Sequence, residues 1–353
     1  MTNKANQHYV PQFYFRYFSD DGKSICVLNR KNGKTIKTAS IKGQSSKKYY
    51  YGDENIEDRL SEIEGHFSEA LRELKGTNSF EQYTPENHAL LLQNIMLQKS
   101  RTVSERKKQK AMQDRFLQLY MECEVNNDDA LDNETKEEFR KIAQTLEADP
   151  KQYQAHGMSI ALECAGSLVD LLPIVLHNKT NRPFIFGDSP VVLTNPLLKQ
   201  ISLRGVLGAQ TPGLIVLYPL SPRHCVMLID AAAYKLKKLN SSVHSIRNLR
   251  DVALINKLQI HNSASAVYFS DFQYSQYVVE LWRQEKTRLI DHIGKVLEAP
   301  GIDHNGEPMG DIIHAFEEQL PLIPKFSFLE YRKVPENEYQ FTSREEYAGV
   351  DDA

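Results

Sequence analysis

The spacing of apolar residues divides the chain into two strand-rich ends and a helical middle. In the segment 24–38, two apolar runs flank Asn32-Gly33, a pair that tolerates the positive φ of a tight turn, so a β-hairpin is predicted there. From Asn55 the apolar residues recur every three or four positions up to Gly76, which predicts a helix. We expect the helical middle to cover about residues 55–175.

A long second helix is predicted from its start signals. Thr84 suits an N-cap, Pro85 the first helical position and Glu86 the acidic first turn, so we expect one helix from here to about residue 124. The polar stretch 126–132 predicts a loop. Further helices are expected over 134–146 and 150–172.

Strand patterns return in the second half of the chain. The run PFIFGDSPVVLTNP, which begins at Pro183, and the run GLIVLYPLSPRHCVMLID, which begins at Gly213, are typical of buried strands, the latter with a corner at its Pro-Leu-Ser-Pro. Helices are expected over 245–263 and 275–297. We therefore predict an α+β fold, with an antiparallel sheet built from N-terminal and C-terminal strands around the helical middle. The expected organisation is one core domain over 1–299 and an acidic extension over 300–353 docked on it.

Composition places the chain among globular proteins. Hydrophobic residues make up 41% and charged residues 25%, and the mean hydropathy is -0.49. The longest apolar stretch is interrupted by Glu163, Asp170 and Pro173, so no membrane span is expected. The first residues lack the apolar core of a secretory signal, and the four cysteines lie far apart. We expect a cytoplasmic protein with no membrane association, disulfide or structural zinc.

Three polar residues fall on otherwise apolar helix faces. Gln98 lies three and seven residues after apolar positions, Arg101 lies four residues after Leu97, and Asn256 shares the stripe of Ile260. A buried amide or guanidinium without a partner costs roughly 1–3 kcal/mol or more. These side chains therefore belong either to an internal network that fixes the helix packing or to a polar cavity, and the sequence leaves both open.

Two further residues suit catalysis. Asp188 follows a strand and a glycine, a common position for a carboxylate that binds a metal or moves a proton. The alternative is an Asx turn in front of Pro190. His8 has the proton affinity of a general acid or base. The alternative is a hydrogen-bonded histidine in a structured N-terminal arm.

The motifs together resemble a known family. HYVPQFYFRYF, which begins at His8, the stretch Gln98-Lys-Ser-Arg101-Thr, FIFGDSPVVL, YPLSP and Asn256-Lys-Leu-Gln259 occur in this order. They resemble a bacterial domain-of-unknown-function family whose opening signature is H-x-V-P-x-x-Y-L, over about residues 8–275. Phe15 replaces the usual leucine, and Ser189 stands where the family more often has asparagine. The resemblance implies a shared architecture and no particular reaction, and all five polar residues above fall within its motifs.

Several familiar enzyme classes are not indicated. The sequence has no G-x-x-x-x-G-K-[ST], G-x-G-x-x-G, H-E-x-x-H or G-x-S-x-G motif. Neither hydrolysis of nucleoside triphosphates nor the mechanism of the α/β-hydrolases is therefore expected.

Charge is distributed unevenly, although the net charge is only -3. The stretch 22–52 has no acidic residue and holds three tyrosines near its end, a combination that suits phosphate contacts and base stacking. A second basic cluster lies on the long helix, and the segment 300–353 is acidic, so we expect that segment to lie near one of the two clusters. Solvated surfaces without a partner are the alternative. The basic residues of the first stretch are Lys23, Arg30, Lys31, Lys34, Lys37, Lys42, Lys47 and Lys48, and those of the helix are Lys99, Arg101, Arg106, Lys107, Lys108, Lys110 and Arg115.

Two functions of different classes follow. The first is a nucleic-acid-processing hydrolase, a nuclease-like effector in bacterial defence or toxicity. In it Asp188 would pair with Arg101 and bind a divalent metal or activate water, His8 would transfer protons, and Arg101 would stabilise phosphate charge. Its five polar residues should converge on one cavity, and the substrate-binding residues would be Gln98, Asn256, Lys47, Lys48 and Tyr50. The second is a non-catalytic module that binds a small ligand or nucleic acid.

Overall fold

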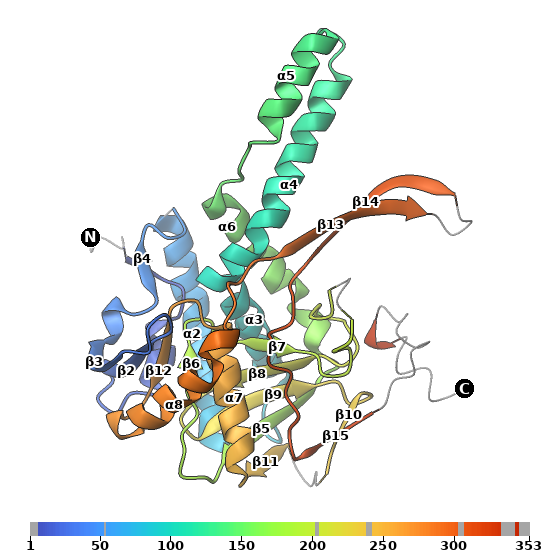
Figure 1. Ribbon diagram of the computed structural model, residues 1–353. Helices are drawn as coiled ribbons and strands as arrows, with labels where there is room; N and C mark the ends of the chain where they lie inside the picture. The colour runs from blue at the N-terminus through green and yellow to red at the C-terminus, as the bar shows by residue number, and fades with distance from the viewer. Residues whose placement is uncertain are drawn as a thin grey trace.

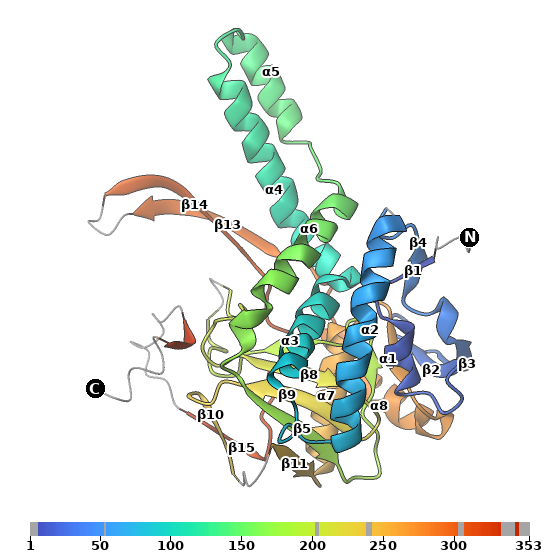
Figure 2. The same ribbon diagram turned by 180° about the vertical axis from the view of Figure 1, so that it is seen from behind.

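The computed structural model describes residues 6–52, 54–201, 205–237, 242–302, 307–332 and 343–345. It confirms the α+β fold. Helices α2, α3 and α6 lie on one face of the larger sheet and α7 lies on the other (Figures 1 and 2). The helices are α1 (Gln12–Arg16), α2 (Glu54–Thr77), α3 (Pro85–Ser100), α4 (Val103–Asn127), α5 (Asn133–Ala143), α6 (Pro150–Glu163), α7 (Leu249–Asn262) and α8 (Ser275–Glu285).

The larger sheet has five strands in the order β11-β5-β9-β8-β7. Its neighbours pair antiparallel except β11 and β5, which run parallel, so this sheet is mixed. Alternate residues point to opposite faces: Val216 and Val226 join the core beneath α2 and α3, whereas Ile215 and Met227 join the core beneath α7. The strands are β5 (Leu172–Asn178), β7 (Val192–Thr194), β8 (Ile215–Pro219), β9 (His224–Ile229) and β11 (Val243–Ile246).

The smaller sheet joins the two halves of the chain. Its order is β3-β2-β12-β6, with all neighbours antiparallel, and β2 (Ser24–Asn29) and β3 (Thr35–Ser40) form the predicted hairpin. Gly33 in the turn has φ of +70°, as expected for this position. The N-terminal strand β2 therefore pairs with β12 (Ala266–Phe269), whose other neighbour is β6 (Phe186–Gly187). Strand β1 (Asn6–His8) pairs separately with β4 (Ser46–Lys48).

Three expected helices are clearly shorter than predicted, and the one expected over 150–172 ends at Glu163. The helix expected over 84–124 is two helices, because α3 ends at Ser100 and Thr102 caps α4 by accepting from the backbone N–H of Glu105. The helix expected over 275–297 ends at Glu285, after which β13 (Lys295–Ile302) pairs with β14 (Pro308–Phe316). Strand β13 crosses the position between residues 299 and 300 where the sequence suggested a domain boundary.

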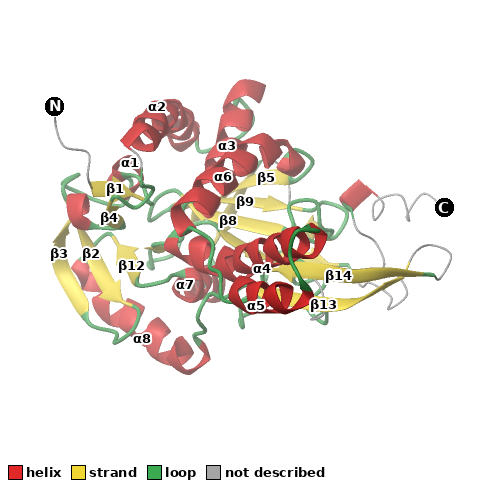
Figure 3. Ribbon diagram, turned by 90° about the horizontal axis from the view of Figure 1, so that it is seen from above, coloured by secondary structure: helices red, strands yellow, loops and turns green. Residues whose placement is uncertain are grey.

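Two arms project from the core. Helices α4 and α5 pack as a hairpin, and β13 with β14 forms a two-stranded ribbon beside it (Figures 1 and 3). After the ribbon the chain returns to the core, where Phe326 and Phe328 are buried beside α7 and β15 (Leu329–Tyr331) pairs with β10 (Tyr234–Leu236). Within the described residues, no helix has both the length and the apolar character needed to cross a membrane.

Candidate functional site

The guanidinium of Arg101 closes a buried junction between α2, α3 and the N-terminal strand. Its side chain is 2% exposed, and Nη1 donates to Oε1 of Glu64 at 2.7 Å. Nε donates to the hydroxyl of Tyr51 at 3.2 Å, and Nη2 donates to the carbonyl oxygen of His8 at 2.5 Å. Burial would lower the pKa of Arg101, but Tyr51 and Glu64 raise it above its usual value, so the group stays charged.

Gln98 and His8 are occupied by backbone contacts in the same region. Nε2 of Gln98 donates to the carbonyl of Tyr9 at 2.9 Å. Nε2 of the His8 ring lies 3.2 Å from the carbonyl of Lys42, which requires that nitrogen to carry the hydrogen. Burial lowers the pKa of His8, so the ring is neutral at neutral pH. Both side chains therefore fix the N-terminal segment, as the structural alternative for His8 expected.

Asp188 is also buried, and its carboxylate is engaged by backbone N–H groups. Its carboxylate accepts from the N–H groups of Ala264 at 2.7 Å, Ser265 at 2.8 Å and Ala266 at 3.2 Å. Burial raises the pKa of Asp188 to about 6, although these three donors and Arg30 act against the rise. Ala264 and Ser265 lie between α7 and β12, and Ala266 is the first residue of β12, so these hydrogen bonds are not those of the Asx turn that was the alternative.

Asn256 belongs to a row of amide side chains on α7. Residues 256, 259 and 262 lie at helical spacing and satisfy the backbone of the segment 183–191, which has few strand partners of its own. The arrangement is an internal network and not a polar cavity. Asn256 accepts from Ile185 N at 3.0 Å and donates to Pro183 O at 2.9 Å, Gln259 accepts from Gly187 N at 3.0 Å and donates to Pro190 O at 2.9 Å, and Asn262 donates to Ser189 O at 2.6 Å and Val191 O at 2.9 Å.

The five polar residues thus do not converge on one cavity. Arg101, Gln98 and His8 hold the N-terminal segment, whereas Asp188 and Asn256 hold the segments around α7. The predicted pair of Arg101 and Asp188 is wrong, because the carboxylate beside Arg101 comes from Glu64 on α2, a partner that sequence spacing does not reveal. In the described part of the chain no three His, Cys, Asp or Glu side chains are grouped to hold a metal ion.

Three residues proposed to contact a substrate, Lys47 and Lys48 on β4 and Tyr50 after it, differ in exposure. Lys47 and Lys48 are exposed, as a binding role requires. Tyr50 is buried, with the guanidinium carbon of Arg106 3.7 Å from its ring centroid, so its ring has no face for a nucleobase. Tyr49 is 45% exposed and is the tyrosine of this group that solvent reaches.

The basic cluster on the long helical region is largely neutralised within the protein. Glu317 of the acidic segment pairs with Lys99 and Lys108, which confirms that this segment lies against the helices. The cluster therefore offers little free positive charge. The other partners are Glu105 for Lys99, Glu64 for Arg101, Asp114 and Glu147 for Lys110, and Glu122 and Glu298 for Arg115, while Arg106 donates to Gln154 and to the carbonyl of Tyr50.

The stretch 22–52 is different, because its lysines face solvent. They lie on β3, on β4 and in the connections around β2, β3 and β4, at one end of the molecule (Figure 3). In the described residues none of them is within ion-pair distance of a carboxylate. Trp282 of α8 fixes the hairpin by donating from Nε1 to the carbonyl of Arg30 at 2.7 Å. We call this surface the lysine-rich end, and its exposed lysines are Lys23, Lys31, Lys34, Lys37, Lys42, Lys47 and Lys48.

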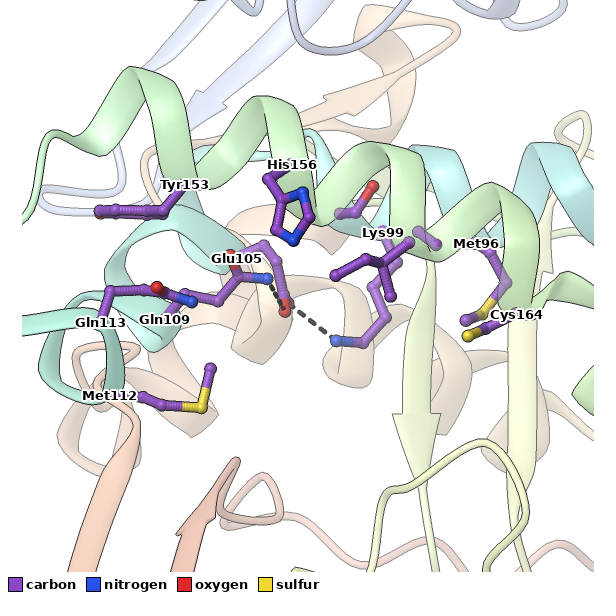
Figure 4. A pocket seen from close by; sticks show the side chains of 13 residues that line it. Met96, Lys99, Glu105, Gln109, Met112, Gln113, Tyr153, His156 and Cys164 are labelled. Carbon is purple, nitrogen blue, oxygen red and sulfur yellow. Dashed lines mark hydrogen bonds and ion pairs between the residues drawn. The ribbon is translucent and has the colours of Figure 1, made fainter. Parts of the chain in front are cut away.

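A cavity of about 280 Å³ lies between α3, α4 and α6 (Figure 4). Nζ of Lys99 and Oε2 of Glu105 form an ion pair of 2.8 Å within it, and Tyr153 and His156 line it from α6. No sequence motif predicted this cavity. The helical spacing of Tyr153 and His156 was its one local signal, whereas Glu317, which closes the ion cluster, lies more than two hundred residues from Lys99 along the chain.

Comparison with known proteins gives a family and no activity. Neither the curated proteins nor the solved structures contain a match to this chain. A family model described as a protein of unknown function, DUF4238, matches residues 6–272 and so covers the N-terminal segment, the helical middle and both sheets. The chain belongs to this DUF4238 family.

Proposed function

We propose that the protein is a non-catalytic nucleic-acid-binding module that acts through its lysine-rich end. One observation carries the proposal: seven exposed lysines gather there without carboxylate partners in the described residues, while the cations of the helical cluster are mostly paired internally. A solvent-facing group of unpaired cations attracts a polyanion and releases its counterions on binding.

Local geometry favours a single-stranded ligand. Tyr49 is exposed directly after Lys47 and Lys48, so a base can stack on its ring while the neighbouring ammonium groups contact phosphates. Strand β3 is an edge strand with Lys37 exposed on it, which extends the positive surface along the hairpin. These contacts involve backbone phosphates and ring faces, so binding should depend little on base sequence.

The buried networks support binding over hydrolysis. The hydrolase hypothesis requires His8, Arg101 and Asp188 to act on one substrate, yet each is engaged with the protein's own backbone or with Glu64. A nuclease activity in bacterial defence or toxicity stays a prediction, and a nuclease assay with and without divalent metal would test it.

The proposal predicts that charge reversal at the hairpin weakens binding. Lys34→Glu combined with Lys37→Glu should reduce the affinity for labelled single-stranded DNA and RNA, measured by fluorescence anisotropy, because two phosphate contacts become repulsive. The matched control is Lys141→Glu combined with Lys199→Glu, which changes the net charge equally at two exposed lysines away from this end. An equal loss in both variants would show that net charge alone matters, and the site assignment would be wrong.

A further inference from the structure

The carboxylate of Glu317 lies between two lysines in the manner of a bound anion. Its Oε2 is 2.9 Å from Nζ of Lys99, and its Oε1 is 2.5 Å from Nζ of Lys108. Burial alone would raise the pKa of Glu317, but Lys108 and Lys99 together lower it to about 2. The two lysines therefore form a strong site for negative charge.

The lysines and the carboxylate come from separate parts of the chain. The bend between α3 and α4 at Arg101 and Thr102 turns Lys99 and Lys108 toward the same point. Glu317 arrives from the segment after β14, which belongs to the projecting ribbon. Thus the cationic part of the site lies within the span matched by the family model, and the anion that fills it lies outside that span.

A further donor lies beside the cluster. A small cavity there is lined by Lys99, Lys108, Ser189 and Asn262, and the hydroxyl of Ser189 is buried with no hydrogen-bond partner among the described residues. Buried hydroxyls normally have a partner, so this one indicates a place for an acceptor. A glutamate has two carboxylate oxygens and uses both on the lysines, whereas a phosphate has enough oxygens for Lys99, Lys108 and Ser189 together.

There is also space for the remainder of a ligand. Lys99 and Glu105 line both the small cavity and the neighbouring cavity of about 280 Å³. The latter offers the thioether of Met96, the ring of Tyr153 and the imidazole of His156 (Figure 4). Its volume is close to the lower end of the range for small-molecule sites, about 300 Å³.

We propose that Lys99 and Lys108 bind the phosphate group of a small organic phosphate, and that Glu317 fills this site in the free protein. The body of the ligand lies in the cavity against α6. Glu105 keeps its ion pair with Lys99 and accepts a hydrogen bond from Nε2 of Gln109 at 3.1 Å. Because Glu317 occupies the position between the two lysines, the phosphate must replace it and cannot bind in addition to it. The site is distinct from the lysine-rich end and does not depend on nucleic-acid binding there.

Replacing Glu317 separates this proposal from an ordinary structural ion pair. Glu317→Gln removes the competing charge, so inorganic phosphate should bind that variant about tenfold or more tightly than it binds the wild type. The matched control is Glu318→Gln, which removes the same charge from the adjacent residue, whose exposed side chain pairs with Lys295. The readout is the rise in melting temperature in phosphate compared with chloride at equal ionic strength.

The expected result is a phosphate-dependent rise in Glu317→Gln that exceeds the rise in the wild type and in Glu318→Gln, and that Lys108→Gln in the same background removes. A nucleoside monophosphate should stabilise Glu317→Gln more than inorganic phosphate does, because it also fills the cavity. Equal stabilisation by the two ligands would restrict the site to free phosphate and overturn the assignment of the cavity. Equal phosphate shifts in the wild type and both single variants would overturn the site itself.

If Glu317→Gln does not fold in chloride, recovery of folded protein on refolding in phosphate supports the site, and failure to recover it contradicts the site.

Discussion

Arg101→Ala is expected to lower the free energy of unfolding by about 3–5 kcal/mol, because removing one partner of a buried ion pair leaves the other uncompensated. Glu64 would lose its cation, and the carbonyl of His8 and the hydroxyl of Tyr51 would lose a donor. Arg101→Lys should recover only part of this loss, since a single ammonium group cannot reach all three acceptors that the planar guanidinium of Arg101 contacts. Urea denaturation followed by circular dichroism measures both changes.

The matched control is Arg140→Ala on α5. Arg140 also donates to several acceptors, at Asn126 and Glu137, but its side chain is 40% exposed, so the loss should be below about 1 kcal/mol. A stable Arg101→Ala protein that has lost nucleic-acid binding would contradict the structural role assigned to Arg101.

Asp188→Ala is expected to cost about 2–4 kcal/mol, because three partly buried backbone N–H groups lose their acceptor at once. Asp188→Asn keeps one carbonyl oxygen of the same size and should cost less. Denaturation in urea compares the two variants with the wild type. An unchanged stability in Asp188→Ala would show that these amide groups find other acceptors.

The stability of the wild type relative to Asp188→Asn should also depend on pH. Burial raises the pKa of Asp188 in the folded protein to about 6, above its ordinary value of 3.8. The folded state therefore binds the proton more tightly, so this contribution to stability is fully present below pH 3.8 and is lost as the pH rises through about 6. Urea midpoints of both proteins across this interval test the sign. A difference that grows as the pH rises would contradict it.

Local signals in the sequence were enough for the fold class and for the hairpin at Asn32-Gly33, because turn chemistry and apolar periodicity act over short distances. The bend at Arg101 had such a signal too: Thr102-Val-Ser-Glu105 has the pattern of a capping box, although only its Thr102 half is seen in the structure. The ribbon formed by β13 and β14 could not be predicted from the helical spacing before it, since each of its strands depends on the other.

The candidate site could be predicted only in part from the sequence, for a similar reason. Helical periodicity identified Gln98, Arg101 and Asn256 as buried polar residues, and all three are buried. It could not identify their partners, because Glu64, Tyr9 and the segment 183–191 come from other elements. Charge density likewise marked two basic regions, but only the structure shows that Glu317 and Glu298 neutralise one of them.

The salt dependence of nucleic-acid binding tests the central claim most directly. The affinity of the intact chain for labelled single-stranded DNA should fall linearly with salt concentration on a logarithmic plot, and the combination of Lys34→Glu and Lys37→Glu should make that slope shallower by about 2, or about 1 for each lost phosphate contact. The control at Lys141 and Lys199 should keep the slope of the wild type. A wild-type protein whose affinity does not change with salt, or a slope that the Lys34 and Lys37 substitutions leave unchanged, would contradict the assignment of the lysine-rich end as the binding surface.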